Sequence, residues 1–331
     1  MLDTAPIEAA RQLADDVLFP AALATDAAPR VPEALLERLA DAGLFALAGP
    51  REQGGLAVDP ATFSAVVEAL ASGCLATTFV WLQHHGAVHA LASSANAALA
   101  QAWLPDLCAG RRRAGLALSA LRPGPMQLQA RPVSGGFELD GVAPWVTGWS
   151  LVDVLLTPAR AGDEAVTLLL DARPGAGLIA SERALVAANA SRTVELAFHS
   201  HFVPSERLVA SALHAPPPAH DGGGRSNGSL ALGVTRRACS LIGPSTLDTE
   251  LEQRRAELDG ADEFAMARAR AAAAELALRA SAAAITALGS SSIRLEAQAQ
   301  RLAREALFLL AFGSRPAIRA ALLGALGATP R

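Results

Sequence analysis

The 331-residue sequence contains no tyrosine and no lysine, so all 28 of its basic residues are arginines. These absences exclude a lysine Schiff base, a P-loop lysine and a tyrosine acid from any chemistry that the protein performs. Alanine makes up about a quarter of the chain, far above its ordinary share. Alanine, arginine, glycine and proline have GC-rich codons, whereas lysine and tyrosine do not. This codon bias is the simplest explanation of the composition.

Cysteine and net charge are also scarce. The three cysteines lie far apart and form no Cys-x-x-Cys pair, which argues against a disulfide framework and against a zinc cluster. A net charge of −4 gives no electrostatic footprint for nucleic acid or for an anionic membrane. Apolar runs such as 306–312 are much shorter than a membrane span, and the N-terminus has no signal-peptide layout. We therefore expect a cytoplasmic protein with neither a nucleic-acid partner nor a membrane.

The pattern of apolar residues divides the chain into three blocks and one linker. Residues 1–112 have helical spacing, and residues 113–212 contain short β-rich runs between Gly, Pro, Asp and Ser clusters. Residues 213–228 are rich in proline and glycine and are expected to form a linker loop. Residues 229–331 are helical and rich in alanine. The sequence predicts an α+β fold with an N-terminal helical domain, a central antiparallel β domain and a C-terminal helical bundle.

Particular residues mark the expected elements. Asp59 and Pro60 predict a helix start, and a helix near 95–103 is expected to end before Pro105. Strands are expected in the central block at 115–119, 137–142, 152–157, 166–171 and 194–198. Helices are expected in the last block at 229–242, 246–258, 261–287, 293–312 and 315–327.

Five short strings in the first two blocks carry a family resemblance. They read Gly-Leu-Phe…Pro-Arg-Glu-Gln-Gly-Gly at 43–55, Trp-Leu-Pro-Asp-Leu-Cys-Ala-Gly at 103–110, Gly-Leu-Ala-Leu-Ser at 115–119, Gly-Val-Ala-Pro-Trp-Val-Thr at 141–147 and Val-Glu-Leu-Ala-Phe at 194–198. In this order, between helical blocks, they resemble the acyl-CoA dehydrogenase family. A looser match continues through Ala287-Leu288-Gly289 in the last block, which is shorter than usual for that family.

The resemblance implies FAD held between the β domain and the bundle, in contact with a neighbouring subunit as well. It also implies an oxidoreductase that removes two hydrogens across the Cα–Cβ bond of an acyl thioester such as an acyl-CoA. In that reaction a carboxylate takes the α-proton and the β-hydride passes to the flavin. Such chemistry requires a positioned base and an electron sink in a dry pocket.

The resemblance assigns cofactor-binding residues to this chain. Leu118 and Ser119 match a strand end that contacts the flavin ring, although Ser119 could equally be an ordinary polar residue at a strand end. Trp145 matches a tryptophan that packs against the flavin, and the alternative is packing in the core of the β domain. Thr147 matches a residue that bonds near flavin N5. Gly289 either lets the backbone approach FAD closely or is a plain helix C-cap.

The sequence departs from the family at the catalytic base. Phe312 stands where the resemblance places the usual glutamate, and no aspartate or glutamate follows Glu305. The other base position of the family, on the first helix of the bundle, is also empty because 225–244 contains no acid. A phenyl ring accepts no proton, so we identify no catalytic residue in this chain.

Two further departures concern the cofactor and the substrate path. The segment that holds FAD phosphates in the family corresponds to 244–260, which has Arg254 and Arg255 but no Phe-Gly. The strand-end glutamate and the Gly-Ser-Asp that follows it in the family are replaced by Ala120 and residues 121–125. That region normally helps to shape the path of the acyl-CoA.

Three histidines, His84, His85 and His89, lie on one expected helix. His85 and His89 have the i, i+4 spacing of two metal ligands, but no third ligand stands at a sensible spacing. We expect these histidines to be structural or solvent-exposed, and we expect no metal.

We interpret the sequence as an FAD-dependent, acyl-CoA dehydrogenase-like oxidoreductase that acts on the CH–CH group of an acyl thioester. We expect it to form a homo- or hetero-oligomer with another chain of this type, including as a base-lacking subunit of a heteromeric enzyme. Two alternatives stay open. One is monooxygenase-like chemistry on the same fold, which needs no α-proton base. The other is a non-catalytic structural subunit that has lost its flavin.

Overall fold

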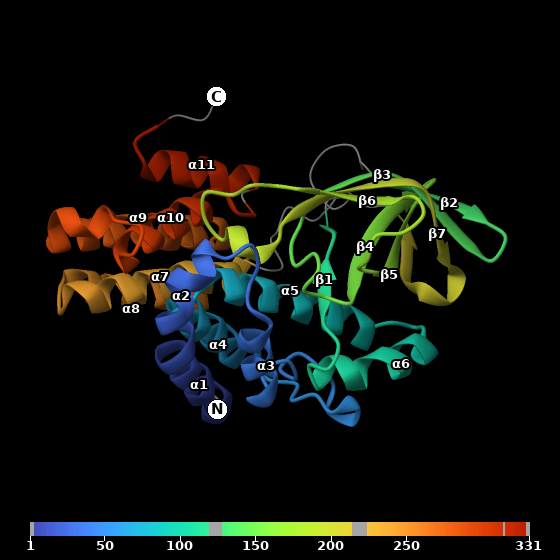
Figure 1. Cartoon of the computed structure of the whole chain (residues 1–331), viewed down its shortest axis with the longest axis horizontal. Coiled ribbons are helices and arrows are strands. Elements are labelled where there is room, and N and C mark those ends of the chain that lie inside the picture. The colour runs from blue at the N-terminus through green and yellow to red at the C-terminus, as the bar shows by residue number, and fades with distance from the viewer. Residues whose placement is uncertain (1–2, 119–127, 214–223, 314, 329–331) are drawn as a thin grey trace.

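The computed structural model describes residues 3–118, 128–213, 224–313 and 315–328. Within these ranges the expected order of helices, then a β-sheet, then helices is confirmed. Figure 1 shows the sheet at the right, the C-terminal helices at the left and the N-terminal helices beneath both.

The N-terminal block consists of helices that bury apolar faces against one another. They are α1 (Thr4–Leu13), α2 (Phe19–Ala27), α3 (Glu33–Asp41), α4 (Pro60–Gly73), α5 (Leu75–Ala92) and α6 (Ala97–Cys108), with a π-helical turn at Ala14–Leu18 and a 3₁₀ turn at Arg51–Gln53. The predicted cap at Asp59 is confirmed. Its carboxylate accepts hydrogen bonds from the N–H groups of Ala61 at 3.0 Å and Thr62 at 2.9 Å.

The prediction that the last helix of this block ends before Pro105 is wrong. Helix α6 continues through Pro105 to Cys108, and the Ala109 N–H donates to the Pro105 carbonyl at 3.1 Å. A proline inside a helix costs about 3 kcal/mol. Leu104 and Leu107 beside it are 2% and 0% exposed, and burying two leucines stabilises by about 3–6 kcal/mol. Their burial therefore offsets the cost of the proline.

The central block forms one eight-stranded sheet. Its strands are β1 (Ala114–Leu116), β2 (Leu128–Val133), β3 (Gly136–Val146), β4 (Val154–Ala161), β5 (Glu164–Asp171), β6 (Leu178–Glu182), β7 (Val194–Pro204) and β8 (Leu208–Leu213). The order is β6-β7-β3-β2-β4-β5-β8, and β1 pairs with β4. The short 3₁₀ turn Asn189–Ser191 precedes β7.

The expected strands correspond to β1, β3, β4, β5 and β7, whereas β2, β6 and β8 are not predicted. Strand β2 contains Pro132, and β6 and β8 expose most of their side chains, so none of the three has a strong alternating pattern. The sheet is also not purely antiparallel, since β1 and β2 each pair in parallel with β4. Other strands lie between these partners in the sequence, and such long connections permit parallel pairing.

The C-terminal block contains α7 (Gly224–Ile242), α8 (Thr246–Gly260), α9 (Met266–Leu288), α10 (Gln298–Ala311) and α11 (Pro316–Ala325). The predicted linker 213–228 is too long at its C-terminal end, because α7 begins at Gly224; residues 214–223 lie outside the described residues. Gly228 explains the early start. A Cβ there would stand 2.7 Å from Leu258 Cδ2, so the glycine lets α7 pack closely on α8.

The apolar core is continuous between the first and last helical blocks, and smaller cores lie inside the sheet and between the sheet and α5–α6. The segment Met266–Ile293, with a mean hydropathy of 1.4, is long and apolar enough to cross a membrane. In this fold the segment's helix α9 packs against α7, α8, α10 and α11, so its alanines serve as the centre of the bundle. The three cysteines are free and buried.

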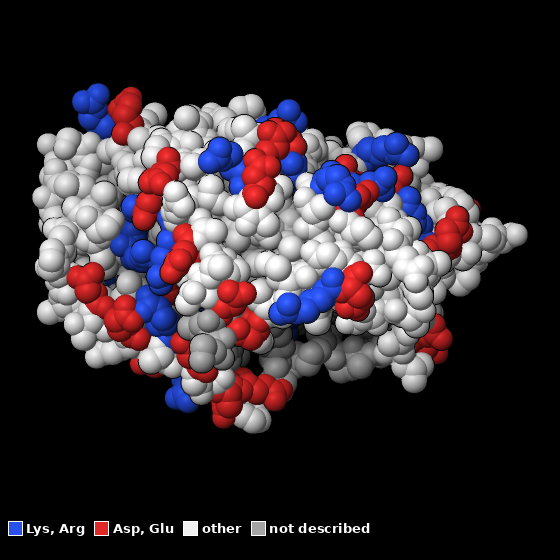
Figure 2. Space-filling view, turned by 90° about the horizontal axis from the view of Figure 1, so that it is seen from below, with Lys and Arg blue, Asp and Glu red and all other residues white. Residues whose placement is uncertain are grey.

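Charged side chains of both signs are interspersed on the surface. Figure 2 shows acidic and basic groups lying beside one another on the face drawn, without a stripe of one sign. Salt bridges such as Arg111–Asp106 and Arg304–Asp26 occur in the described part of the chain. An even mixture of this kind gives no long-range field that would attract a polyanion to that face.

Candidate flavin site

Trp145 stands at a distorted point near the end of β3. Its φ is +62°, and the pairing of β3 with β7 shifts register between Ala143 and Val146. Such a bulge turns a side chain away from its regular position and is frequent at functional sites. The Trp145 side chain is 51% exposed, whereas nearby Trp149 is 5% exposed and belongs to the core of the sheet. The alternative of Trp145 as a core residue is therefore wrong, and its indole offers a free apolar surface.

Thr147 follows Trp145 and is buried. Its hydroxyl oxygen lies 3.2 Å from that of Thr193, which lies 3.0 Å from the hydroxyl oxygen of Ser191. The Gly148 N–H donates to the Ser191 carbonyl at 2.9 Å. This chain of bonds fixes the backbone after Trp145 against the turn Asn189–Ser191. A hydroxyl both donates and accepts, so Thr147 keeps further bonding capacity.

Strand β1 brings Leu118 toward this segment. A Cβ built on Gly115 would stand 3.2 Å from the Thr147 carbonyl oxygen, so β1 and the Thr147 backbone are in close approach. The Ala117 N–H donates to the Leu156 carbonyl of β4 at 2.9 Å. Leu118 is 39% exposed beyond it. Ser119 lies outside the described residues.

Phe312 belongs to a compact aromatic cluster, here called the phenylalanine cluster, with Phe79 of α5 and Phe308 of α10. The ring of Phe312 lies 4.7 Å from that of Phe79 in an edge-to-face arrangement and 5.6 Å from that of Phe308 in a stacked one. Val80, the next residue of α5, lies 3.7 Å from a Cβ built on Gly148. Adjacent residues of α5 thus meet Phe312 and the segment after Trp145.

Arg270 of α9 holds the backbone at Phe312, a role that sequence reasoning missed because its only signal is an arginine in an alanine-rich helix. Its guanidinium donates to the carbonyls of Phe312 at 2.6 Å and Gly313 at 3.0 Å, and lies 5.8 Å above the Phe312 ring. The last carbonyls of a helix have no partner within the helix, so Arg270 satisfies the end of α10.

Comparison with known proteins identifies the family. Residues 4–111 match the model of the acyl-CoA dehydrogenase N-terminal domain. Benzylmalonyl-CoA dehydrogenase of Aromatoleum aromaticum is 26% identical over 244 residues, which cover 69% of this chain and 63% of that protein. The chain is an acyl-CoA dehydrogenase-like protein. The match spans about 60% of the length of the curated relatives, with 58% covered in the short-chain specific acyl-CoA dehydrogenase of Bos taurus.

Solved structures confirm the acyl-CoA dehydrogenase fold along the whole chain. Butyryl-CoA dehydrogenase of Megasphaera elsdenii superposes with a TM-score of 0.83 at 17% identity, over 98% of both chains. Glutaryl-CoA dehydrogenase of Mycobacterium smegmatis, solved in complex with FADH2, superposes with a TM-score of 0.79 at 18% identity, over 98% of this chain and 94% of that one.

Glu305 is the acid that precedes Phe312 most closely, and it is committed elsewhere. It is buried on α10 and accepts a hydrogen bond from Arg301 at 2.5 Å. Burial raises the pKa of the Glu305 carboxyl, while Arg301 opposes that shift. Glu305 and Phe312 are seven positions apart, which corresponds to about 10 Å along a helix.

Gly289 forms the C-cap of α9. Its φ is +72°, and its N–H donates to the Ile285 carbonyl, which supports the plain C-cap interpretation. The helix between Arg270 and Gly289 has a length of about 28 Å. Phe312, held by Arg270, and Gly289 therefore lie near opposite ends of α9, and one chain does not bring them together.

Arg254 and Arg255, which fall where the family holds FAD phosphates, are each paired with acids. Arg254 contacts Glu257 at 2.6 Å and Glu250 at 3.3 Å. Arg255 contacts Glu68 of α4 at 2.6 Å and pairs with Glu252 as well. Both guanidinium groups are therefore paired with carboxylates within the chain.

The three histidines of α5 do not share a site. His84 and His85 are buried, and His89 is exposed. No group of three potential metal ligands occurs among the described residues. Burial lowers the pKa of His84 to about 3 and holds the pKa of His85 well below its usual value, so both rings are neutral.

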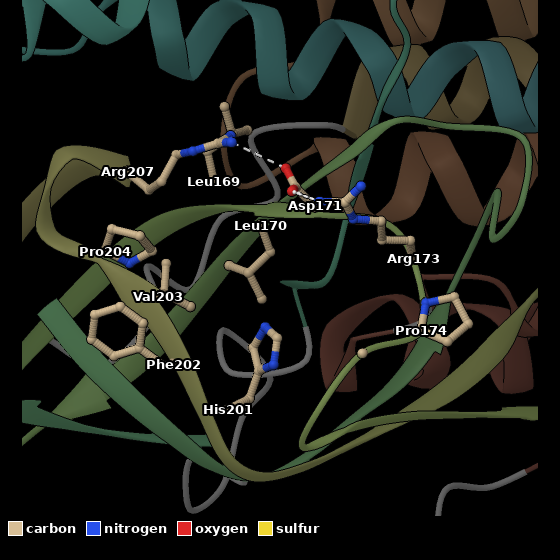
Figure 3. A pocket seen from close by; sticks show the side chains of 11 residues that line it. Leu169, Leu170, Asp171, Arg173, Pro174, His201, Phe202, Val203, Pro204 and Arg207 are labelled. Atoms are coloured by element: carbon tan, nitrogen blue, oxygen red, sulfur yellow. Dashed lines mark hydrogen bonds and ion pairs between the residues drawn. The ribbon is translucent and has the colours of Figure 1, made fainter.

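A surface cleft of about 230 Å³ lies on the sheet, away from these residues (Figure 3). Asp171 bridges Arg173 and Arg207 there, at 3.1 Å to each. His201 points toward Leu170 (Figure 3), and its Nδ1 lies 3.1 Å from the Ala176 carbonyl. None of the predicted site residues lines this cleft.

Proposed function

We propose that the chain is a flavin-binding subunit of an acyl-CoA dehydrogenase-like enzyme that lacks its own catalytic base. In this proposal a partner chain of the same family supplies the carboxylate, and the complex oxidises the Cα–Cβ bond of an acyl thioester. Similarity to the family supports the reaction class. The lack of an acid at the two base positions of the family supports a partner chain as the source of the carboxylate.

The phenylalanine cluster is the observation that carries this proposal. Phe312 stands where the family resemblance places the base, and Phe79 and Phe308 pack directly against its ring. Arg270 holds the backbone at that point. A carboxylate from the same chain would have to displace these rings, and Glu305 is already paired with Arg301. The position is therefore built for packing and has no proton acceptor.

The residues around Trp145 fit the ring of a flavin. The half-exposed Trp145 indole offers a flat apolar surface, and the backbone at Leu118 and the Thr147 hydroxyl lie on neighbouring segments. FAD, when bound, supplies the acceptor for a hydride. Trp145 would cover the ring, Thr147 would offer a hydrogen bond, and the buried backbone of Thr147 and Gly148 would exclude water from that side.

The arrangement also favours an oligomer. Gly289 lies near the opposite end of α9 from Phe312, so its exposed backbone would reach a cofactor held by another chain more readily than one held by its own. Arg254 and Arg255 are paired with acids, so phosphate contacts would come from other residues, including those of a partner.

The test is the absorption spectrum of the purified protein, made alone and co-expressed with other family members encoded beside it. We expect a colourless chain alone, and a yellow complex that transfers hydrogen from an acyl-CoA to an artificial electron acceptor. Yellow protein that is active alone would overturn the proposal. Product that depends on oxygen and supplied reduced flavin would replace it with monooxygenase-like chemistry.

A second candidate, a non-catalytic structural subunit without flavin, is favoured by the pairing of Arg254 and Arg255. Neither guanidinium is left to neutralise a diphosphate, which is the most highly charged part of FAD. This candidate predicts a colourless protein in every complex and no change of melting temperature with added FAD.

A further inference from the structure

Strand β1 is short and joins the helical block to the sheet. It has three residues, Ala114–Leu116, and pairs in parallel with β4 on one side. It also packs against α5. The chain then passes Leu118 at the candidate flavin site. The position of β1 therefore determines where Leu118 lies.

His84 of α5 binds the start of this strand. The Ala114 N–H donates to His84 Nδ1 at 3.1 Å, and both residues are buried, with exposures of 0% and 1%. An imidazole nitrogen accepts a hydrogen bond only when it carries no proton, so this bond requires the neutral ring with its proton on Nε2. The low pKa of His84 ensures that state throughout the physiological range.

The same helix makes room for the end of the strand. Gly86 faces Leu116, and a Cβ on Gly86 would stand 2.8 Å from Leu116 Cδ1. Helix α5 thus provides a hydrogen-bond acceptor for the first residue of β1, and its Gly86 leaves space for the side chain of the last residue of β1. His85 lies between these two positions in the sequence. Its ring packs against the aromatic rings of Trp81 and Phe63, with centroid distances of 4.5 Å and 5.0 Å.

We propose that His84 is a positioning residue of the candidate flavin site: its Nδ1 docks β1 onto α5, and this fixes both the approach of Gly115 to the Thr147 backbone and the position of Leu118. The inference rests on the proposed function, because it assigns a purpose to that placement. His84 is buried, so it would act on the site through β1. The charged group that acts on His84 is Arg113, whose positive charge further disfavours protonation. The His85 ring lies 5.3 Å away between ring centroids.

Three variants separate the hydrogen bond from simple packing. His84→Asn places an amide oxygen the same number of bonds from Cβ as Nδ1 and keeps an acceptor. His84→Leu keeps apolar volume and removes it. His85→Leu is the matched control, since both nitrogens of that buried ring have no hydrogen-bond partner among the described residues.

The readouts are the hydrogen-exchange rate of the Ala114 amide and the dissociation constant for FAD in the complex with its partner. A buried donor left without a partner costs enough to raise opening by roughly tenfold or more. We expect His84→Leu to raise both quantities by about that factor, and His84→Asn to restore values within roughly threefold of the wild type. His85→Leu is expected to leave both unchanged.

The outcomes distinguish this inference from the proposed function. A yellow wild-type complex whose two readouts are unchanged in His84→Leu overturns the inference alone. A colourless wild-type complex overturns the proposed function and the flavin role of His84 with it, while the Ala114 exchange rate still decides the docking. If His84→Leu does not fold, His84→Gln takes its place, because its amide reaches the Nε2 position and leaves Ala114 unpaired. Normal Ala114 protection in His84→Gln would then refute the docking.

Discussion

Acid will destabilise this protein through the two buried histidines of α5. Burial lowers the pKa of His84 from 6.5 to about 3, and burial together with the adjacent His84 ring lowers that of His85. In the unfolded chain both rings regain ordinary values near 6.5. Between pH 6.5 and about 3 the unfolded chain therefore binds more protons than the native one. Stability is complete above pH 6.5 and falls as the pH is lowered through this window.

The size of the loss follows from the fully buried environment. A pH of 5 is about 1.5 units below the pKa of His84 in the unfolded chain. Protonation of His84 at this pH stabilises the unfolded chain by about 2 kcal/mol. The lowered pKa of His85 adds a loss in the same direction. The limiting slope is about 1.4 kcal/mol per pH unit for each histidine. A loss of about 2 kcal/mol is already a large fraction of the stability of an ordinary domain.

Urea unfolding at a series of pH values between 8 and 5 measures this loss, with His85→Leu as the comparison. Leucine takes up no proton, so the free energy of unfolding of the variant should fall less than that of the wild type over that range. The raised pKa of Glu305 acts in the opposite direction, since it favours the native state as the pH falls. That contribution is common to both proteins and cancels in the difference. Equal losses in wild type and variant would refute the reasoning.

Three further predictions follow from the bundle. Arg301→Met alone should destabilise by about 3–5 kcal/mol because it strands the buried Glu305 charge, whereas combining it with Glu305→Leu should recover most of that loss in urea unfolding. Arg270→Ala should cost about 1–3 kcal/mol and raise proteolysis near residue 313, because two carbonyls lose their donor. With flavin supplied, Phe312→Glu should bleach flavin with acyl-CoA at least about tenfold faster than Phe312→Gln. Equal rates would show that the missing base is not what limits the chain.

Local features of this fold could be predicted from the sequence. The order of helices and strands follows from apolar spacing, and the Asp59 cap follows from a residue type that accepts hydrogen bonds from the next turn. The predictions from the sequence are wrong where tertiary packing overrides the local conformational preference of a residue. Pro105 lies inside α6 because Leu104 and Leu107 are buried beneath the sheet. Gly228 lies in α7 and not in the predicted linker, because it packs against Leu258 of α8.

The candidate site depends on contacts between residues that are distant in sequence. Phe79 and Phe312 are 233 positions apart and meet only through the packing of α5 against the end of α10. The bond from Ala114 to His84 joins a strand to a helix, and no local spacing signals it. The sequence did reveal that position 312 has no acid. It could not reveal that two other phenylalanines and Arg270 make that position a packed one.

The positions that the family resemblance links to chemistry differ in what they face. Phe312 faces aromatic rings, Arg254 and Arg255 face carboxylates, and Gly289 caps its own helix. Each is satisfied within the chain. Trp145 is the contrasting case, because a strained backbone holds its large apolar ring half exposed to solvent. Exposing such a ring is unfavourable unless something covers it, and the flavin of the proposed function would cover the surface around Trp145.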